Sequence, residues 1–386
     1  MNHIKFLFLS VLVAVVAFGC EAVQDDDVWQ DLELRTEYHN IKVVKVAGDL
    51  ERPWALAFLP DGRLLVTERP GRLNIVENGN ITQVNGTPQV RAVNQGGMLE
   101  VSVHPNYEEN GWIYLTYSKA GEDNETALTV VRGRLDGNDF IDIEEIFEQN
   151  RYSSPGRHYG SKIAWDNEGY MYVSIGDRGA NPPRAQDNSD HAGTLLRLND
   201  DGTVPDDNPY VNDDSVANEI FSYGHRNIQG LIINQENNEI WATEHGPRGG
   251  DELNYVRATA NYGWPDASLG LDYRDDTRFH QHTVARSIEG MEDPVYEFLP
   301  TLAPSGLALV TSDKFPRWEG NLLAGGLRAE RIRRLVIEDY TVTHDEEILT
   351  FELGRIRDVR EGPDGFIYVV TDENPGGIYR IEPNDD

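Results

Sequence analysis

The sequence predicts an all-β chain that folds as a six-bladed β-propeller. Helical periodicity is scarce, and Gly, Asp and Asn separate short alternating or fully apolar runs, a pattern typical of all-β proteins. One short pattern recurs six times: a polar turn, four or five strand-forming residues, then a small or acidic residue. The copies lie roughly 45 to 80 residues apart, which leaves room for about four strands and their loops in each unit.

The six copies follow one another along most of the chain, and each is expected to carry a turn and the inner strand of one blade. They are Asp61-Gly62 before RLLVTE, Asn110-Gly111 before WIYLTYS, Asn167-Glu168-Gly169 before YMYVSIGD, Asn237-Asn238 before EIWATEHG, Glu319-Gly320 before NLLAGG, and Asp364-Gly365 before FIYVVTDE. A β-sandwich would show shorter and more even spacing, and a β-helix would repeat far more often.

Residues 41–384 are predicted to form this propeller as one domain, because no Pro/Ser-rich linker divides them. The apolar stretch from Ile41 to Val46 is placed to add a strand to the last blade. That strand would close the ring and remove exposed sheet edges.

The N-terminal segment is typical of an exported protein. Lys5 precedes an unbroken apolar run from Phe6 to Phe18, and the small residue Gly19 follows. The run is shorter than the roughly 18 apolar residues of a membrane-spanning helix. We therefore expect residues 1–19 to be a cleaved signal peptide.

Cys20 is the only cysteine, which excludes an internal disulfide and a cysteine-based zinc site. Its position directly after Val16 to Gly19 resembles the lipobox of bacterial lipoproteins, whose cysteine is acylated. Residues 20–40 would then be a lipidated tether, the only contact with a membrane, and the protein would be periplasmic or on the cell surface. The alternative is an ordinary signal peptide with a chance cysteine.

A formal net charge of -32 excludes DNA and RNA as partners, because polyphosphate would be repelled. The same charge suits an exported protein that uses divalent cations.

Residues just beyond each repeat converge on the propeller axis, and several have the chemistry of a site. His158 is a candidate general base, since neutral imidazole accepts a proton near pH 7; the alternative is a histidine satisfied within the fold. Gly246 and Pro247 follow the fourth repeat and could offer carbonyl oxygens to a hard cation, although a plain turn explains them equally.

Three arginines suggest a bound anion in this acidic chain. Arg355 and Arg357 are two residues apart, so on a strand they share a face, and Arg328 after the fifth repeat is placed to join them. Arginine matches carboxylates in bidentate geometry. The alternative is that these arginines balance surface carboxylates.

Nine stretches in a consistent order resemble the glucose/sorbosone dehydrogenase family, the soluble sugar dehydrogenases that use pyrroloquinoline quinone (PQQ), and most of all its aldose sugar dehydrogenase branch. The resemblance runs from about Pro53 to Ile381. The stretches are PWALAFLPDGRLLVTERPGRL from Pro53, NQGGMLEVSVHP from Asn94, HYGSKIAWD from His158, SIGDRG from Ser174, GHRNIQGL from Gly224, TEHGPRGGDELN from Thr243, NYGWP from Asn261, LPTLAPSGL from Leu299 and GRIRDV from Gly354.

The resemblance implies a six-bladed propeller that oxidises aldoses at the anomeric carbon to lactones, by hydride transfer to PQQ with the help of calcium. It makes His158 the general base and Arg226 a catalytic residue that stabilises charge on the quinone oxygen. It also implies a larger set of residues that bind the cofactor or line the site. These are Gln95, Arg226, Asn227, Tyr296, Thr301, Arg328, Arg355 and Arg357.

For calcium, the resemblance implies Gly246 and Pro247 as backbone ligands at the active site, and Glu252 and Tyr262 at a second, structural site. Three positions depart from the soluble glucose enzymes of the family. Arg328 replaces a lysine, Leu299 a tryptophan, and Pro182 a sugar-contacting glutamine. We therefore expect a small-molecule aldose substrate without strict glucose specificity, and an unknown periplasmic electron acceptor.

Two other readings stay open. One is a non-catalytic propeller that binds calcium or a glycan and has lost redox activity; the joint presence of His158, Gln95, Arg226 and Arg357 argues against it. The other is a propeller hydrolase, which would arrange carboxylates around an axial metal and fits an arginine-rich set poorly.

Overall fold

The computed structural model describes residues 29–384, except residue 155 and residues 276–279. The chain divides into two units, Met1–Gln30 and Asp31–Asp386, and the second is described here. The predicted signal peptide and Cys20 lie outside the described residues. In the part of the chain that is described, no helix has the length and apolar character needed to cross a bilayer.

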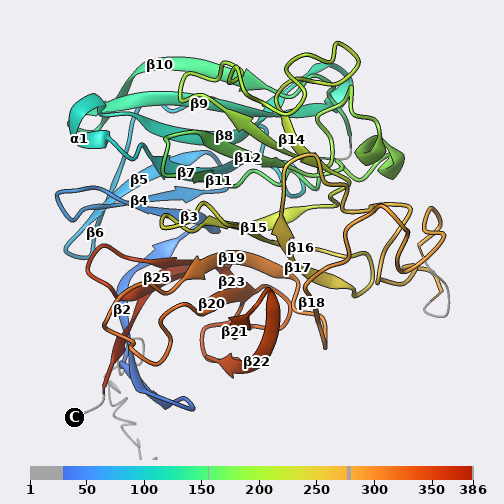
Figure 1. The fold of residues 1–386 in the computed structure, drawn as a ribbon. Coiled ribbons are helices and arrows are strands. Elements are labelled where there is room, and N and C mark those ends of the chain that lie inside the picture. Colours follow the sequence, from blue (N-terminus) through green and yellow to red (C-terminus); the bar gives the residue numbers. More distant parts are fainter. Residues whose placement is uncertain (1–28, 155, 276–279, 385–386) are drawn as a thin grey trace, which may run out of the picture. The chain divides into compact units, whose positions relative to one another are not determined.

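The unit is built from six antiparallel sheets in chain order, as Figure 1 shows. The first three blades each have four strands. They comprise β3 (Pro53–Phe58), β4 (Leu64–Glu68), β5 (Arg72–Glu77) and β6 (Asn80–Gln83); β7 (Met98–Val103), β8 (Ile113–Ala120), β9 (Thr126–Asp136) and β10 (Asp139–Glu148); and β11 (Ile163–Trp165), β12 (Met171–Ile175), β13 (Thr194–Leu198) and β14 (Ile220–Tyr223).

The last three blades continue the pattern, and the sixth gains two strands from the N-terminal side. They comprise β15 (Ile228–Ile233), β16 (Ile240–Glu244), β17 (Asp251–Val256) and β18 (Tyr296–Phe298); β19 (Pro304–Leu309), β20 (Leu322–Gly326), β21 (Arg331–Glu338) and β22 (Thr341–Ile348); and β23 (Ile356–Glu361), β24 (Ile367–Thr371), β25 (Gly376–Pro383), β2 (Asn40–Leu50) and β1 (Leu32–Arg35). Three short helices lie in loops: α1 (Tyr107–Asn110) and the 3-10 turns Glu122–Asn124 and Pro182–Gln186.

The predicted all-β, six-bladed propeller is confirmed, but the repeat strands are not the innermost ones. The repeats form β4, β8, β12, β16, β20 and β24, the second strand of each sheet. The preceding strands β3, β7, β11, β15, β19 and β23 adjoin one another around the axis. The prediction was wrong on this point because both strands are almost wholly buried, so hydrophobic pattern alone does not separate them.

Ring closure by the N-terminal stretch is confirmed. β2 pairs with β25 over a register that includes Val43 opposite Ile381, and Figure 1 shows blue β2 beside red β25. Both side chains are buried, so the closing sheet shares in the core. β1 extends this sheet outward by pairing with β2, and it lies within residues 20–40, which the sequence assigned to a tether.

Four charged side chains from three blades meet inside the ring of first strands. The ammonium of Lys162 lies 2.9 Å from carboxylate oxygens of both Glu100 and Asp358, and Arg360 bridges the same two acids at 2.5 and 2.9 Å. Glu100 and Asp358 have no exposed side-chain surface. The two positive and two negative charges compensate one another, which makes their burial tolerable.

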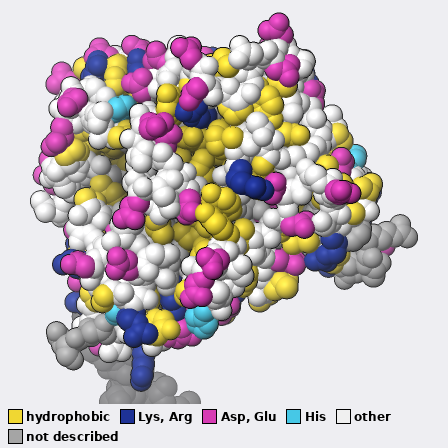
Figure 2. Space-filling view, viewed as in Figure 1, with side chains coloured by type: hydrophobic (Ala, Val, Ile, Leu, Met, Phe, Trp, Pro, Cys, Tyr) yellow, Lys and Arg dark blue, Asp and Glu magenta, His cyan; other side chains and the backbone are white. Residues whose placement is uncertain are grey.

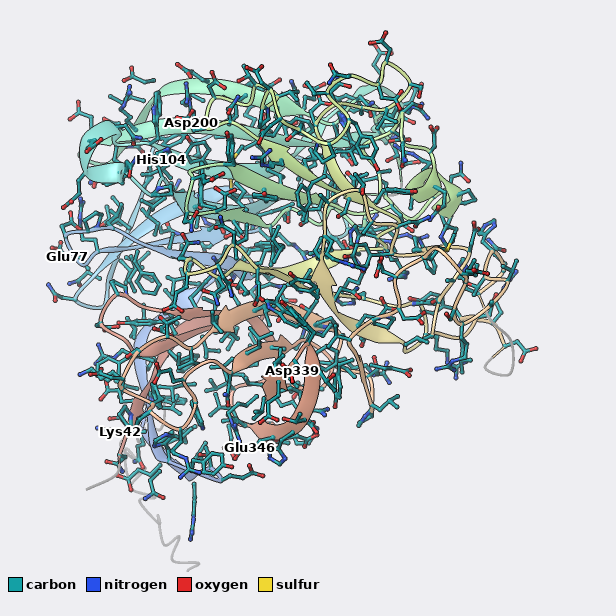
Figure 3. The ribbon with its side chains drawn as sticks, viewed as in Figure 1. Lys42, Glu77, His104, Asp200, Asp339 and Glu346 are labelled. Atoms are coloured by element: carbon teal, nitrogen blue, oxygen red, sulfur yellow. The ribbon has the colours of Figure 1, made fainter. Side chains whose placement is uncertain are left out.

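Neighbouring blades are also joined at their outer ends. His104, after β7, faces Asp200, after β13, across 3.7 Å, and Figure 3 labels both. The hydroxyl of Tyr114 donates to the Asp200 carbonyl at 2.9 Å. Acidic side chains are spread over the face in Figure 2, in keeping with the net charge of -32.

Candidate active site

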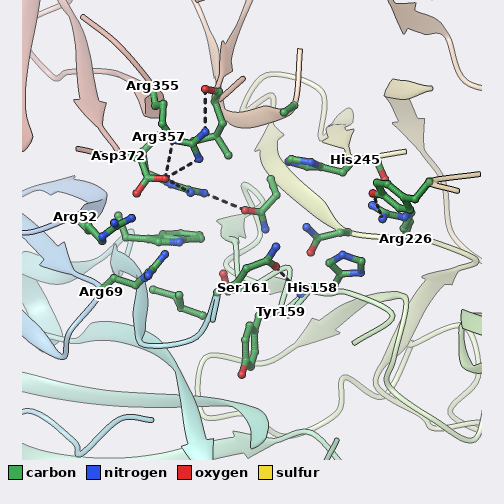
Figure 4. Close-up of a pocket in the computed structure, with 18 residues that line it drawn as sticks. Arg52, Arg69, His158, Tyr159, Ser161, Arg226, His245, Arg355, Arg357 and Asp372 are labelled. Carbon is green, nitrogen blue, oxygen red and sulfur yellow. Dashed lines mark hydrogen bonds and ion pairs between the residues drawn. The ribbon is translucent and has the colours of Figure 1, made fainter. Parts of the chain in front are cut away.

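A cavity of about 300 Å³ opens among loops at the ends of the blades, and Figure 4 shows the side chains around it. It brings together six of the residues predicted from the sequence: Gln95, His158, Arg226, Asn227, Arg355 and Arg357. The remaining lining residues are Arg52, Trp54, Arg69, Leu99, Tyr159, Ser161, Gln229, His245, Tyr273, Ala303, Leu327 and Asp372.

His158 enters the cavity from the loop before β11, with its backbone at φ 52°, a conformation that few non-glycine residues adopt. Its Nδ1 lies 2.6 Å from Asp177 Oδ1, which follows β12. Gly176 makes the approach possible, because a Cβ there would lie 2.3 Å from the His158 carbonyl oxygen. The strained loop therefore delivers one imidazole onto a fixed carboxylate.

Asp177 fixes the tautomer of His158. Burial acts to raise the pKa of Asp177, but attraction to His158 and Arg226 outweighs it and leaves the pKa below its ordinary value. The ionised carboxylate accepts the Nδ1 proton of His158, so Nε2 carries the lone pair. Burial and the nearby Arg226 hold the pKa of His158 below 6.5, against the pull of Asp177. The imidazole is thus neutral near pH 7 and able to accept a proton.

Two predicted site residues hold the His158 loop in place. The side-chain oxygen of Gln95 accepts the backbone N–H of His158 at 2.8 Å, and that of Asn227 accepts the N–H of Gly160 at 3.0 Å. Gln229 adds a donor to the Gly160 carbonyl at 2.9 Å. These amides position the base in addition to lining the cavity.

Arg226 lies near His158 and is held from three sides. Its guanidinium donates to the His245 carbonyl and to the Tyr273 hydroxyl, each at 3.1 Å, and lies 5.2 Å from the ring centroid of Trp264. Trp264 in turn donates its indole N–H to Asp177 at 2.7 Å. Arg226, His158 and Asp177 therefore form one connected group.

On the other side of the cavity, Asp372 binds Arg355 and Arg357 together. Its Oδ2 accepts from Arg355 at 3.0 Å and from Arg357 at 2.9 Å. Burial acts to raise the pKa of Asp372, but Arg357 and Arg355 outweigh burial and leave this pKa below its ordinary value. The carboxylate is therefore ionised. Figure 4 shows this cluster facing His158, His245 and Arg226 across the cavity.

Three residues predicted to bind the cofactor do not line the cavity. Arg328 is exposed, and its neighbour Leu327 faces the site instead, its carbonyl accepting from Arg355 at 3.3 Å. The hydroxyl of Tyr296 accepts from Arg333 at 2.8 Å, and that of Thr301 donates to Asp251. Spacing along the chain cannot reveal which of two adjacent residues turns inward at the end of a strand.

The residues suggested for calcium lie outside the lining set. Gly246 and Pro247 follow His245, and within the described residues their carbonyl oxygens accept no hydrogen bond, which suits a cation ligand. Glu252 has a pKa well above its ordinary value because of burial and the nearby Glu244. Among the described residues, no group of three or more His, Cys, Asp or Glu side chains is arranged to hold a metal.

Tyr262, the other residue of the implied structural calcium site, uses its hydroxyl within the protein. The hydroxyl donates to the Tyr255 carbonyl at 2.7 Å and accepts the backbone N–H of Arg257 at 2.9 Å. Its ring stacks on His225 at 4.4 Å. Only its backbone carbonyl remains as a plausible cation ligand.

Sequence reasoning missed the two carboxylates that organise the site, Asp177 and Asp372. A signal was available, because the repeat pattern itself ends in a small or acidic residue and both aspartates occupy that place. It also missed Arg52, which directly precedes the matched stretch that starts at Pro53, and Arg69, which lies within that stretch.

A six-bladed propeller with a neutral histidine, an ionised aspartate and five lining arginines defines a polar site built for an anionic group and for proton abstraction. The glucose/sorbosone dehydrogenase family model matches residues 50–380. The chain therefore belongs to the glucose/sorbosone dehydrogenase family, and the resemblance seen in the sequence is confirmed.

Two named relatives are sugar dehydrogenases. The chain is 39% identical over 349 residues to the aldose sugar dehydrogenase YliI of Escherichia coli, covering 89% of this chain and 93% of that protein. It is 26% identical over 479 residues to quinoprotein glucose dehydrogenase B of Acinetobacter calcoaceticus, covering 99% of each.

Two solved structures carry the same relationship into three dimensions. The apo form of the soluble aldose sugar dehydrogenase from Escherichia coli matches with a TM-score of 0.86 at 38% identity, covering 89% of this chain and all (100%) of that one. The PQQ-bound aldose sugar dehydrogenase of Streptomyces coelicolor matches with a TM-score of 0.74 at 27% identity, covering 89% and 97%.

Proposed function

We propose that this protein oxidises aldose sugars at the anomeric carbon to lactones, with PQQ and calcium as cofactors and His158 as the general base. The observation that carries the proposal is the contact between His158 Nδ1 and Asp177 at 2.6 Å inside a cavity lined by five arginines. Relatives whose names specify a quinoprotein glucose dehydrogenase and a PQQ-bound aldose sugar dehydrogenase support the cofactor.

The donor set of the cavity fits a tricarboxylate. Of its 18 lining residues five are arginines and only Asp372 is an acid, in a chain whose net charge is -32. Arg355 and Arg357 keep further N–H groups for an anion beyond Asp372. A ligand with several carboxylates is the kind of molecule that balances this charge.

Bound PQQ would supply the hydride acceptor for the anomeric carbon, and calcium would supply positive charge that polarises this acceptor. His158 Nε2 takes the proton of the anomeric hydroxyl as the C–O bond becomes a carbonyl. Asp177 then stabilises the imidazolium that forms, and Arg226 supplies fixed positive charge beside the reacting group. Gln95 and Asn227 keep the base in register through the His158 loop.

We place calcium ligands at the carbonyl oxygens of Gly246 and Pro247, and a structural ion near Glu252 and Tyr262. The free carbonyls support the first site. The pKa of Glu252 is raised by burial and by the nearby carboxylates of Glu244 and Asp251, and a cation bound there would relieve this repulsion. Removing calcium should therefore lower both cofactor retention and thermal stability.

The test is reconstitution. Apo protein loaded with PQQ and calcium should reduce an artificial electron acceptor when given a panel of aldoses. His158→Ala should lower kcat by about 10²- to 10⁴-fold while PQQ still binds. PQQ uptake without aldose oxidation by the folded wild type would favour the non-catalytic binding propeller instead.

Location is a separate proposal. We propose that Cys20 is lipidated and that the propeller works outside the cytoplasm, where it passes electrons to a periplasmic acceptor. Cys20→Ser should move the protein from the membrane fraction to the soluble periplasmic fraction, with sugar oxidation unchanged. An unchanged distribution between the fractions would contradict the anchor.

A further inference from the structure

Arg52 and Arg69 form a pair at the cavity that the chain holds together by backbone contacts. The Arg69 N–H donates to the Arg52 carbonyl at 3.1 Å, and the Arg69 carbonyl accepts the N–H of Met98 at 3.1 Å. Gly97 permits this, since a Cβ there would lie 1.9 Å from the Arg69 carbonyl oxygen. Arg52 has a φ of 49°, a costly backbone conformation for a side chain of this size. The pairing is thus built into the blade.

The carboxylates next to this pair in the sequence are bound to another arginine. Glu51 and Glu68 both bind Arg72, at 2.8 and 2.6 Å. The guanidinium groups of Arg52 and Arg69 form no hydrogen bond or ion pair with any residue that the structure describes. Two cations therefore face the cavity without a protein partner, although the chain is rich in acids.

The electrostatic surroundings show the same excess. Burial lowers the pKa of Arg69. The nearby charges of Arg52, Arg357 and Arg355 lower it further, and Asp372 opposes them. Asp372 is already bonded to Arg355 and Arg357 at 3.0 and 2.9 Å. Figure 4 shows Arg52 and Arg69 beside this cluster, on the side of the cavity away from His158. An anion from outside the chain would relieve the repulsion.

We propose that Arg52 and Arg69 together bind one carboxylate of the polycarboxylate cofactor, separate from the carboxylate held by Arg355 and Arg357. The inference rests on the proposed function. Two guanidinium groups with all their donors free match a carboxylate in fork geometry, and they hold that end of the cofactor while His158 meets the sugar at the other.

The test measures cofactor binding rather than turnover. Arg52→Gln/Arg69→Gln should raise the dissociation constant for PQQ by about 30- to 300-fold. Binding is measured by quenching of tryptophan fluorescence with calcium present. Arg63→Gln is the matched control. It lies at the far end of β4, is paired with Asp61 at 2.7 Å and should leave the constant unchanged.

Monomethyl esters of PQQ identify the carboxylate. Esterifying the carboxylate bound by Arg52 and Arg69 should lower the affinity of the wild type for PQQ but leave that of the Arg52→Gln/Arg69→Gln variant almost unchanged. The affinity of Arg355→Gln/Arg357→Gln should be insensitive to esterification of a different carboxylate. Equal ester losses in wild type and the Arg52/Arg69 variant would overturn the inference.

The outcomes separate the two proposals. If the folded Arg52/Arg69 variant binds PQQ with an unchanged dissociation constant while Arg355→Gln/Arg357→Gln loses affinity, the second carboxylate site is rejected. The proposed function is then kept. A wild type that fails to bind PQQ rejects the proposed function and this inference together. Thermal melting of each variant verifies that it is folded.

Discussion

His158 and Asp177 show how the surroundings set the protonation of single residues in this site. Asp177 has no exposed side-chain surface, yet it is ionised because His158, Arg226 and Trp264 all face it. His158 is neutral because burial and Arg226 outweigh Asp177. Burial and Arg226 thus keep His158 neutral, while His158 and Arg226 together keep Asp177 ionised.

Replacing Asp177 by Asn should leave a base in the wrong tautomer. We expect kcat for aldose oxidation to fall by about 10²- to 10⁴-fold, since Nε2 would no longer be the unprotonated nitrogen. Steady-state kinetics with a dye acceptor would measure this, and PQQ affinity should change little.

Glu219→Gln supplies the control, because Glu219 contacts His191 at 3.3 Å in the same blade but does not line the cavity. Equal losses of activity in the two variants would argue that carboxylates near any histidine of this blade matter only for folding.

His245 should make stability depend on pH. Its pKa is lowered to about 4, because burial and the charge of Arg226 outweigh Asp251. The native state then binds fewer protons than the unfolded state, whose histidine has a pKa of about 6.5, so stability is full above that value and is lost as pH falls toward 4.

His245→Gln removes this titration, and its amide can still donate to the Pro304 carbonyl that Nε2 meets at 2.6 Å. Melting temperatures recorded between pH 4 and 7 should fall more steeply for wild type than for this variant. Parallel curves would exclude the histidine as the source of the dependence.

At the scale of elements, the repeat strand does the same job in several blades. Asp177 after β12 and Asp372 after β24 orient His158 and the arginine pair. Glu244, which ends β16, accepts from the backbone of Arg226 at 2.7 Å. The recurrent acidic residue in the sequence is therefore the part of the repeat that positions histidine and arginine at the cavity.

This explains what could be predicted from the sequence. Turns and strand patterns specify the blades, and the four matched residues His158, Arg226, Arg355 and Arg357 all line one cavity. Arg328 was misplaced and Arg52 was missed because side-chain direction at strand ends depends on tertiary contacts. The β3–β4 pairing and Gly97 decide it for Arg69.

The buried group of Lys162, Glu100, Asp358 and Arg360 should be sensitive to loss of one member. Lys162→Met leaves two buried carboxylates facing only Arg360, which we expect to destabilise the fold by about 3 to 5 kcal/mol. Lys119→Met removes the exposed bridge to Glu145, at 2.7 Å, and should cost less than about 1 kcal/mol. Denaturant unfolding compares the two, and equal losses would contradict the compensation argued here.

For the whole molecule, the decisive contact is between the two ends of the unit. β2 pairs with β25, so the sixth blade depends on residues more than 300 positions apart in the chain. A chain that starts at Pro53 lacks this strand and exposes Ile378 and Ile381 on an open edge.

We expect that shortened chain to self-associate and to melt at a lower temperature than a chain starting at Asp31, which keeps β1 and β2. Light scattering after gel filtration and thermal melting would show the difference. Identical behaviour of the two chains would mean that the sixth sheet is sufficient without its N-terminal strand.

The buried group of Lys162, Glu100, Asp358 and Arg360 also lies close to the cavity. Lys162 lies 4.8 Å from the ring of Trp54, which lines the cavity, so the buried ionic group directly adjoins the site. In the proposed reaction, sugar and oxidant would use this one cavity in turn. A double-displacement rate law, with parallel lines in reciprocal plots, is the kinetic pattern expected when the two substrates use one cavity in turn.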